Sequence, residues 1–178
     1  MHHLTLFSVA VAAMAATAQA FGSSRWRKAP CLCDEEALDI ANRWLSIFST
    51  GGVSGKEEVA TIVSRDLVSA DETFGPPTFG IDAFWAAVTP PAGSPRTTTN
   101  VTQSANFFIR TCDQIAFNWQ YNGVTTGFNS TVPAGTSVAF TGNDIIQVDL
   151  ETRLISNATS SGQWILLAQQ LGGRSCGV

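Results

Sequence analysis

Apolar residues recur at spacings of three and four along the stretch that begins at Asp34, a pattern typical of an amphipathic helix. The run Asp34-Glu35-Glu36 places negative charge in the first turn, where the helix dipole favours it. Gly51-Gly52 ends the pattern. The side chains expected on the buried face are Ala37, Ile40, Ala41, Trp44, Leu45 and Phe48.

Two further helices are predicted after this one. The second begins at the capping box Ser54-x-x-Glu57 and is expected to end near Asp71. The third spans Ile81 to Val88 and is ended by Pro90-Pro91, because proline disfavours helical backbone in the residue before it. The second helix is expected to bury Val59, Ile62, Val63 and Leu67.

From Phe107 onward the apolar residues alternate with polar ones, which predicts strands. Ile115, Phe117, Trp119 and Tyr121 fall on one face, and Ala116, Asn118 and Gln120 fall on the other. Asn122-Gly123 predicts a hairpin turn. Further strands are expected at residues 136–141, 144–150 and 163–170, with turns at residues 142–143 and 157–162.

This order of elements implies an α+β domain that spans residues 31–178. Three N-terminal helices are expected to pack on one face of an antiparallel sheet of four to six strands. A chain of this length suits one domain with a hydrophobic core of its own.

Residues 1–20 have the pattern of a secretory signal peptide. An apolar run from Leu6 to Ala16 is too short to span a bilayer, and Ala18-Gln19-Ala20 fits the signal peptidase site. Residues 21–30 are expected to form a flexible leader. We therefore expect a secreted, extracellular protein without stable membrane association after cleavage; the alternative is a segment retained as a membrane anchor.

Both histidines, His2 and His3, lie in this signal segment. Chemistry that needs an imidazole, such as a Ser/His/Asp triad or a His-based zinc site, is therefore not expected in the mature chain. Charged residues make up only 13% of the sequence and the formal net charge is −4, so no nucleic-acid partner is expected. No cofactor and no metal are expected either.

Four cysteines and three sequons agree with an oxidising compartment. Cys31 and Cys33 are too close for an unstrained bridge to each other, so each is expected to pair with Cys112 or Cys176. A metal site is the rival interpretation of the four thiols. Glycans are expected on Asn100, Asn129 and Asn157, all of which fall in predicted loops.

Several segments of the sequence carry a family resemblance. They are Trp44-Leu-Ser-Ile-Phe48, Leu67-Val-Ser-Ala-Asp71, Gly80-Ile-Asp-Ala-Phe84-Trp85, and Gly142-Asn-Asp-Ile-Ile-Gln-Val-Asp149 followed by Arg153-Leu-Ile-Ser. In this order they resemble the NTF2-like (SnoaL-like) superfamily. The start Cys31-Leu-Cys33-Asp and the strand from Arg110 through Cys112 to Trp119 look like secreted NTF2-like proteins of filamentous fungi.

The resemblance implies a cone, in which a strongly curved sheet wraps around the helices and is open at one end to a pocket. Members include isomerases, dehydratases, cyclases and epoxide hydrolases, as well as transport factors and non-catalytic ligand binders, so the fold does not choose the function. Dehydratase-like members use histidines. Isomerase-like members pair an aspartate base with a tyrosine and a protonated aspartate, and Tyr121, the single tyrosine, does not match that motif.

Candidate site residues follow from the carboxylates and the aromatic residues near them. Asp71 is the first candidate for a pocket base, because Phe74, Phe84 and Trp85 follow it closely and could desolvate it. Its alternative is a carboxylate at a helix end in water. Further candidates are Asp149 and Tyr121 as catalytic groups and Asn118 as a pocket amide, with solvent-facing strand positions as the alternative.

The sequence thus predicts a secreted NTF2-like protein that binds a small apolar ligand, or another protein, without catalysis. The alternative is an isomerase, cyclase or dehydratase with Asp71 or Asp149 as the base. A third hypothesis is a homodimer formed through the convex face of the sheet.

Overall fold

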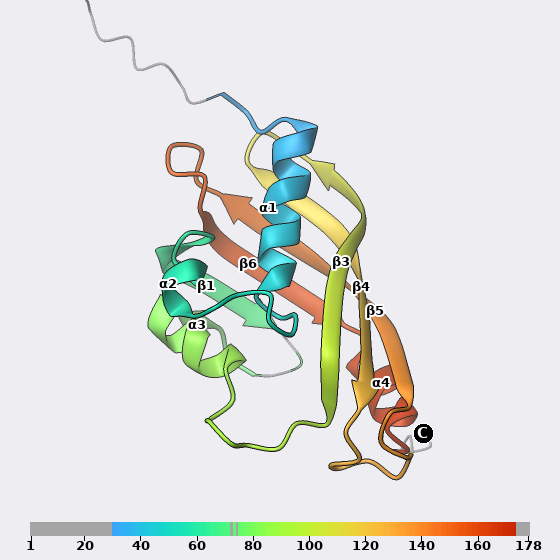
Figure 1. Cartoon of the computed structure of the whole chain (residues 1–178). Helices are drawn as coiled ribbons and strands as arrows, with labels where there is room; N and C mark the ends of the chain where they lie inside the picture. The colour runs from blue at the N-terminus through green and yellow to red at the C-terminus, as the bar shows by residue number, and fades with distance from the viewer. Residues whose placement is uncertain (1–29, 72, 74, 174–178) are drawn as a thin grey trace, which may run out of the picture.

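The computed structural model describes residues 30–71, 73 and 75–173 (Figure 1). Within this part of the chain, helices and strands are mixed along the sequence, which confirms an α+β fold. The elements are α1 (Asp34–Ser46), α2 (Lys56–Val59), β1 (Val63–Asp71), β2 (Thr78–Phe79), α3 (Ile81–Val88), β3 (Thr98–Arg110), β4 (Gln114–Thr125), β5 (Ser137–Val148), β6 (Ile155–Gly162) and α4 (Trp164–Gln170).

The six strands form one curved sheet in the order β2-β1-β6-β5-β4-β3. Strand β1 runs parallel to β6, whereas the other neighbouring pairs are antiparallel. The sheet is therefore mixed, and the expectation of a purely antiparallel sheet was wrong. The helices are not all N-terminal either, because α4 follows the last strand.

The core lies between α1 and the inner face of the sheet, against which α1 packs in Figure 1. The predicted apolar face of α1 is buried, with Trp44 and Leu45 fully inaccessible. The alternation predicted for β4 is also observed, since Ile115, Phe117 and Trp119 point into this core. Both segments repeat one period over enough residues to be identified from sequence.

The second predicted helix was wrong, because only one turn of it forms and the rest is strand β1. The N-cap of that turn is Gly55 rather than Ser54, which donates from its backbone N–H and its hydroxyl to Glu58 at 2.7 and 2.8 Å. A register shift in the β1 and β6 pairing lies between Val63 and Val68. Val63 and Leu67 both point inward, and a spacing of four residues falls on one face in a strand as well as in a helix, so this pair did not distinguish the two.

Three of the predicted turns lie inside strands. Asn122-Gly123 belongs to β4, residues 142–143 belong to β5 and residues 157–162 belong to β6. Gly142 is required by packing, since a Cβ placed there would lie 2.1 Å from the ring of Trp119. The glycine leaves room for an aromatic ring from the neighbouring strand. A glycine inside a strand can have this packing role, whereas its sequence pattern had indicated a turn.

The strand predicted at residues 163–170 is instead helix α4. A short apolar run does not distinguish a buried strand from a helix. The side-chain amide of Gln170 accepts a hydrogen bond from the Ala139 N–H at 2.8 Å and donates one to the Ala139 carbonyl at 2.7 Å. Helix α4 is thereby fixed beside the part of β5 that extends past the β5 and β6 pairing.

A disulfide joins Cys31 to Cys112, one of the pairings left open by the sequence, across a separation of 81 residues. The Leu32 N–H also donates to the Cys112 carbonyl at 2.9 Å, so the start of α1 is fixed to the turn between β3 and β4. Cys33 is exposed and carries a free thiol. Cys176 lies outside the described residues, as do the signal segment with both histidines and residues 21–29 of the leader.

The three sequons lie at exposed positions, two of them on strands rather than in loops. Asn100 is in β3, Asn157 is in β6 and Asn129 is in the connection between β4 and β5. Within residues 30–173, gaps excepted, no helix is long and apolar enough to cross a membrane. The same part of the chain contains no cluster of His, Cys, Asp and Glu suited to a metal ion.

Candidate functional site

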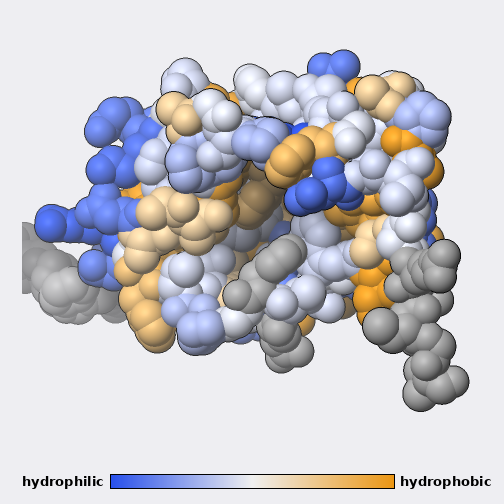
Figure 2. Space-filling model, turned by 90° about the horizontal axis from the view of Figure 1, so that it is seen from below, coloured by the Kyte–Doolittle hydropathy of each residue, from blue (hydrophilic) through white to orange (hydrophobic). Residues whose placement is uncertain are grey.

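An open pocket of about 930 Å³ lies between the end of α1, α3, β1, β6 and the strands β3 and β4. Figure 2 looks onto the side of the molecule that is hollowed, with both apolar and hydrophilic residues around the hollow. Its apolar wall includes Ile47, Phe48, Phe84, Trp85 and Val88. A cavity of this size with a few polar groups is typical of a site for a small molecule.

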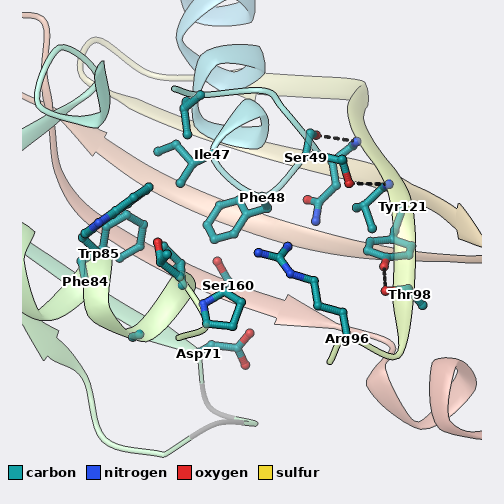
Figure 3. Close-up of a pocket in the computed structure, with 18 of the residues that line it drawn as sticks. Ile47, Phe48, Ser49, Asp71, Phe84, Trp85, Arg96, Thr98, Tyr121 and Ser160 are labelled. Carbon is teal, nitrogen blue, oxygen red and sulfur yellow. Dashed lines mark hydrogen bonds between the residues drawn. The ribbon is translucent and has the colours of Figure 1, made fainter. Parts of the chain in front are cut away.

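Asp71 lines this pocket from the end of β1 (Figure 3). The side chain is half-buried, and its Oδ1 accepts a hydrogen bond from the Thr73 N–H at 2.9 Å. The sequence placed Asp71 at a helix end, whereas it lies at a strand end. Among the described residues that line the pocket, Asp71 carries the only carboxylate.

Phe84 and Trp85 both line the pocket from α3. Phe84 is buried and stacks on Trp44 with ring centroids 5.4 Å apart. Trp85 is half-buried, so part of its ring is available to a ligand. Phe74, the third aromatic expected here, lies outside the described residues.

A second carboxylate, Asp144, lies beneath the pocket in the core, where it is 2% exposed. Trp44 Nε1 donates to its Oδ2 at 2.6 Å and Trp119 Nε1 donates to its Oδ1 at 2.8 Å. Burial raises the pKa of Asp144 above its usual range, and the hydrogen bonds from Trp119, Trp44 and Ser160 partly oppose this rise.

Strand register connects Asp144 to the pocket. Asp144 pairs with Ser160 across β5 and β6, and Ser160 pairs with Asp71 across β6 and β1. The Ser160 hydroxyl, which lines the pocket, hydrogen-bonds the Asp144 carboxyl. A pocket carboxylate, a hydroxyl and a buried acid therefore lie on one row across three strands.

Sequence reasoning missed Asp144, although a signal for it exists. Every second residue of β5 points inward, and Asp144 is the one acid in that series, between Phe140 and Ile146. A lone carboxylate among inward-facing apolar residues must be paired or neutralised. Two tryptophans, one in the predicted first helix and one in a predicted strand, supply the donors.

Tyr121 reaches the pocket from β4. Its hydroxyl shares a hydrogen bond of 2.8 Å with Thr98 Oγ1, and its ring stacks on Phe140 with centroids 4.5 Å apart. Burial raises the pKa of the Tyr121 phenol, and the hydrogen bond to Thr98 lowers it in part. The phenol is therefore neutral near pH 7 and able to donate a hydrogen bond.

Arg96 also lines the pocket and was not singled out by the sequence. It lies in the connection between α3 and β3, which has no apolar period to mark it. Figure 3 shows its side chain extending from that connection into the hollow.

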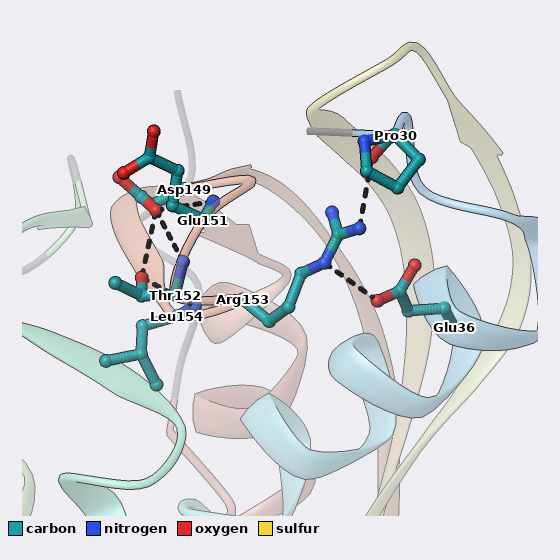
Figure 4. A network of polar contacts seen from close by, with 7 residues as sticks. All are labelled: Pro30, Glu36, Asp149, Glu151, Thr152, Arg153 and Leu154. Atoms are coloured by element: carbon teal, nitrogen blue, oxygen red, sulfur yellow. Dashed lines mark hydrogen bonds and ion pairs between the residues drawn. The ribbon is translucent and has the colours of Figure 1, made fainter. Parts of the chain in front are cut away.

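Two other candidates lie outside the pocket. Asp149 follows β5 in an exposed turn, where its Oδ1 accepts hydrogen bonds from the backbone N–H groups of Glu151 and Thr152 at 2.9 and 2.8 Å (Figure 4). These bonds lower the pKa of Asp149. In the same region Arg153 contacts Glu36 at 3.1 Å and joins this turn to α1. Asp149 therefore has a structural role as the acceptor of a turn.

Asn118 points to the outer face of the sheet, the face opposite α1. Its amide donates to the Gly142 carbonyl at 2.8 Å and accepts from Asn106 at 3.0 Å. The outer face also carries the exposed apolar side chains of Phe107, Ile109 and Ile145.

Comparison with solved structures identifies the architecture. No protein-family model matches this chain, and no curated protein matches its sequence. A protein from Shewanella putrefaciens CN-32 described as a SnoaL-like polyketide cyclase superposes with a TM-score of 0.62 at 12% identity, covering 79% of this chain and 98% of that one. One from Bacillus cereus ATCC 10987 described as a polyketide cyclase gives 0.61 at 16% identity, covering 81% and 87%.

A protein from Catenulispora acidiphila DSM 44928 with a ketosteroid isomerase-like fold, solved with trimethylamine, gives a TM-score of 0.59 at 15% identity and covers 76% of this chain and 94% of that one. These neighbours share the NTF2-like fold, and so does this chain. The resemblance inferred from the sequence is confirmed at the level of fold. Identities this low carry nothing about ligand or reaction.

Proposed function

We propose that the pocket binds a small, largely apolar carbonyl compound and that Asp71 acts on it as a general base. This is the acid–base alternative considered from the sequence, with Asp71 preferred over Asp149 because Asp149 does not line the pocket. The observation that carries the proposal is Asp71 on the wall of a 930 Å³ pocket whose lining also includes the apolar side chains of Trp85 and Phe84. A carboxylate on the wall of such a pocket can reach a bound molecule and accept a proton from it.

The proton transfer uses residues that already face the pocket. The Asp71 carboxylate takes a proton from the carbon next to the carbonyl, and the electron pair of that C–H bond moves onto the carbonyl oxygen as an enolate. The hydroxyl group of Tyr121 lines the same pocket and is able to donate a hydrogen bond to that oxygen. Return of the proton to another carbon completes an isomerisation, whereas attack of the enolate on a second carbonyl carbon closes a ring.

The test uses 5-nitrobenzisoxazole, a small apolar compound whose ring opens when a base removes its C3 proton. The N–O bond breaks as the proton leaves, and the product is a coloured phenolate. We expect Asp71→Asn to lower kcat/KM for this reaction by about a hundredfold, the usual contribution of a general base. The matched control is Asp66→Asn, an exposed position on the same strand. Equal rates for the wild type and Asp71→Asn would contradict the role of Asp71.

Binding without catalysis is the second candidate, and one observation favours it. Both oxygens of Asp144 already accept indole N–H groups, so this acid is held by the core. A pure binding protein would bind neutral apolar dyes with or without Asp71 and would not accelerate ring opening of 5-nitrobenzisoxazole above the rate of free acetate. That pair of results would replace the catalytic proposal with a carrier function.

Secretion is proposed on the basis of residues 1–20 and of the disulfide between Cys31 and Cys112.

A homodimer through the outer face is proposed from the exposed Phe107, Ile109 and Ile145. The Asn157 sequon lies in β6 with its side chain exposed, in register with Gln147 and near Ile145. We expect a glycan at Asn157 to keep the chain monomeric.

The measurement is the solution mass of secreted protein before and after enzymatic removal of glycans. The deglycosylated chain should have twice the mass of one protomer at micromolar concentration, and Ile145→Lys should restore the monomer. A monomer after complete deglycosylation would rule out the dimer.

A further inference from the structure

The pocket contains one positive charge, on Arg96, and no acidic side chain of the described residues pairs with it. The other described cations are engaged elsewhere or lie away from the pocket. Lys56 pairs with Asp82, Arg110 with Asp34 and Arg153 with Glu36, while Arg43 donates to Thr61. Arg65 is exposed on β1, outside the pocket lining.

The backbone at Arg96 is fixed, although no described residue forms an ion pair with its side chain. The Arg96 carbonyl accepts a hydrogen bond from the Thr126 hydroxyl, and the neighbouring Thr97 carbonyl accepts one from the Thr126 N–H at 2.9 Å. The connection is thus tied to the end of β4. These bonds fix the backbone from which the exposed Arg96 side chain extends.

Arg96 and Asp71 line the same pocket without forming an ion pair. A carboxylate and a guanidinium that do not neutralise each other leave a positive and a negative region in one pocket. A ligand with a single negative group is attracted to the Arg96 side and is repelled from the Asp71 side. The two charges therefore give a ligand one preferred orientation.

We propose that Arg96 binds the anionic group of the ligand, so that the compounds this site accepts are small apolar carboxylates. Guanidinium presents paired N–H donors that match the two oxygens of a carboxylate. The apolar body of the compound then lies against Phe48 and Trp85, and its reacting carbon lies toward Asp71. This inference rests on the proposed function, because it assumes that the pocket binds a small apolar molecule.

The charge of the whole chain makes this inference specific to Arg96. The formal net charge is −4, so the average field of the protein repels anions. A preference for an anion over a neutral compound of the same shape must then come from local positive charge. Within the described pocket lining, that charge is on Arg96 alone.

The test compares two fluorescent probes with nearly the same apolar body, the anionic 8-anilinonaphthalene-1-sulfonate and the neutral N-phenyl-1-naphthylamine. We expect Arg96→Gln to weaken binding of the sulfonate about tenfold, the usual worth of one charge-assisted hydrogen bond, and to leave the neutral probe unchanged. Arg96→Lys should retain part of the preference. The control is Arg65→Gln, which removes an equal charge outside the pocket.

The outcomes separate this inference from the proposed function. An unchanged ratio of the two affinities in Arg96→Gln, with the neutral probe still bound, would overturn the role of Arg96 alone. A wild-type protein that binds neither probe would overturn the small-molecule pocket itself. Salt gives an independent readout, since the sulfonate affinity of the wild type should fall with ionic strength while that of Arg96→Gln should change little.

Discussion

Asp144→Asn should lower the free energy of unfolding by about 3 kcal/mol, because a buried donor that loses its acceptor carries the full cost of its desolvation. The aspartate accepts from Trp44 at one oxygen and from Trp119 at the other. An asparagine has the same shape, but it offers one oxygen and turns an NH₂ group toward the second indole. Urea unfolding followed by tryptophan fluorescence measures the loss.

Two variants make this prediction specific. Asp39→Asn, at an exposed position on α1, removes the same charge and should change stability little. Trp119→Phe in the Asp144→Asn background removes the donor that lost its acceptor, so the double variant should lose less than the sum of the two single changes. An Asp144→Asn protein as stable as the wild type would show that the two indoles do not depend on this acceptor.

The burial of Asp144 should also make the free energy of unfolding depend on pH. Burial raises the pKa of Asp144 in the folded state above its value of 3.8 in the unfolded chain. Between these two pKa values the folded state holds a proton that the unfolded state has released, so the free energy of unfolding falls as pH rises through this window and is level above it. Subtracting the pH curve of the Asp144→Asn variant from that of the wild type removes the contributions of the other titrating side chains. The excess in the free energy of unfolding of the wild type over Asp144→Asn should therefore be largest at acid pH.

Removal of the Cys31 and Cys112 disulfide should cost roughly 4 kcal/mol, the value that chain entropy assigns to a loop of this size. The bond spans 81 residues and joins the start of α1 to the turn between β3 and β4. The double variant Cys31→Ser/Cys112→Ser avoids leaving an unpaired thiol at either position. Thermal unfolding of this variant and of the wild type, both without reductant, measures the difference.

Cys33→Ser is the matched control for this prediction. Cys33 is exposed with a free thiol, so its replacement should leave stability unchanged. A loss comparable to that of the double variant would instead indicate that Cys33 pairs with Cys176, which was the second bond expected from the sequence. Wild-type stability in Cys31→Ser/Cys112→Ser would contradict the loop-closure account.

The parts of the fold that could be predicted are those where one period repeats without interruption. The face of α1 repeats every three to four residues, and β4 alternates from Ile115 to Tyr121. Strand β1 was missed because Val63 and Leu67 lie four residues apart, a spacing that falls on one face of a strand and of a helix alike. Strand β1 pairs with β6, more than eighty residues later, and a local sequence pattern does not contain that pairing.

The residues of the candidate site also differ in whether a local sequence pattern reveals them. Asp71 and Trp85 were found because aromatic residues lie close to the carboxylate in sequence. Asp144 acquires its surroundings from Trp44, 100 residues earlier, and from Trp119 on the neighbouring strand. Arg96 enters the pocket from a connection without any pattern. Asn118 was assigned to the pocket because alternation shows which residues share a face but not which face is inside.

The contact between Gln170 and Ala139 bears on how this protein avoids self-association through its backbone. Strand β5 continues past the point where β6 ends, which would leave a row of unpaired N–H and C=O groups able to pair with another chain. The Gln163 N–H bonds the Thr141 carbonyl at 3.0 Å, and the Gln170 amide then occupies both backbone groups of Ala139. The Gln170 side chain thus takes the place of a missing strand. Helix α4 thereby blocks this edge of β5 from pairing its backbone with another chain.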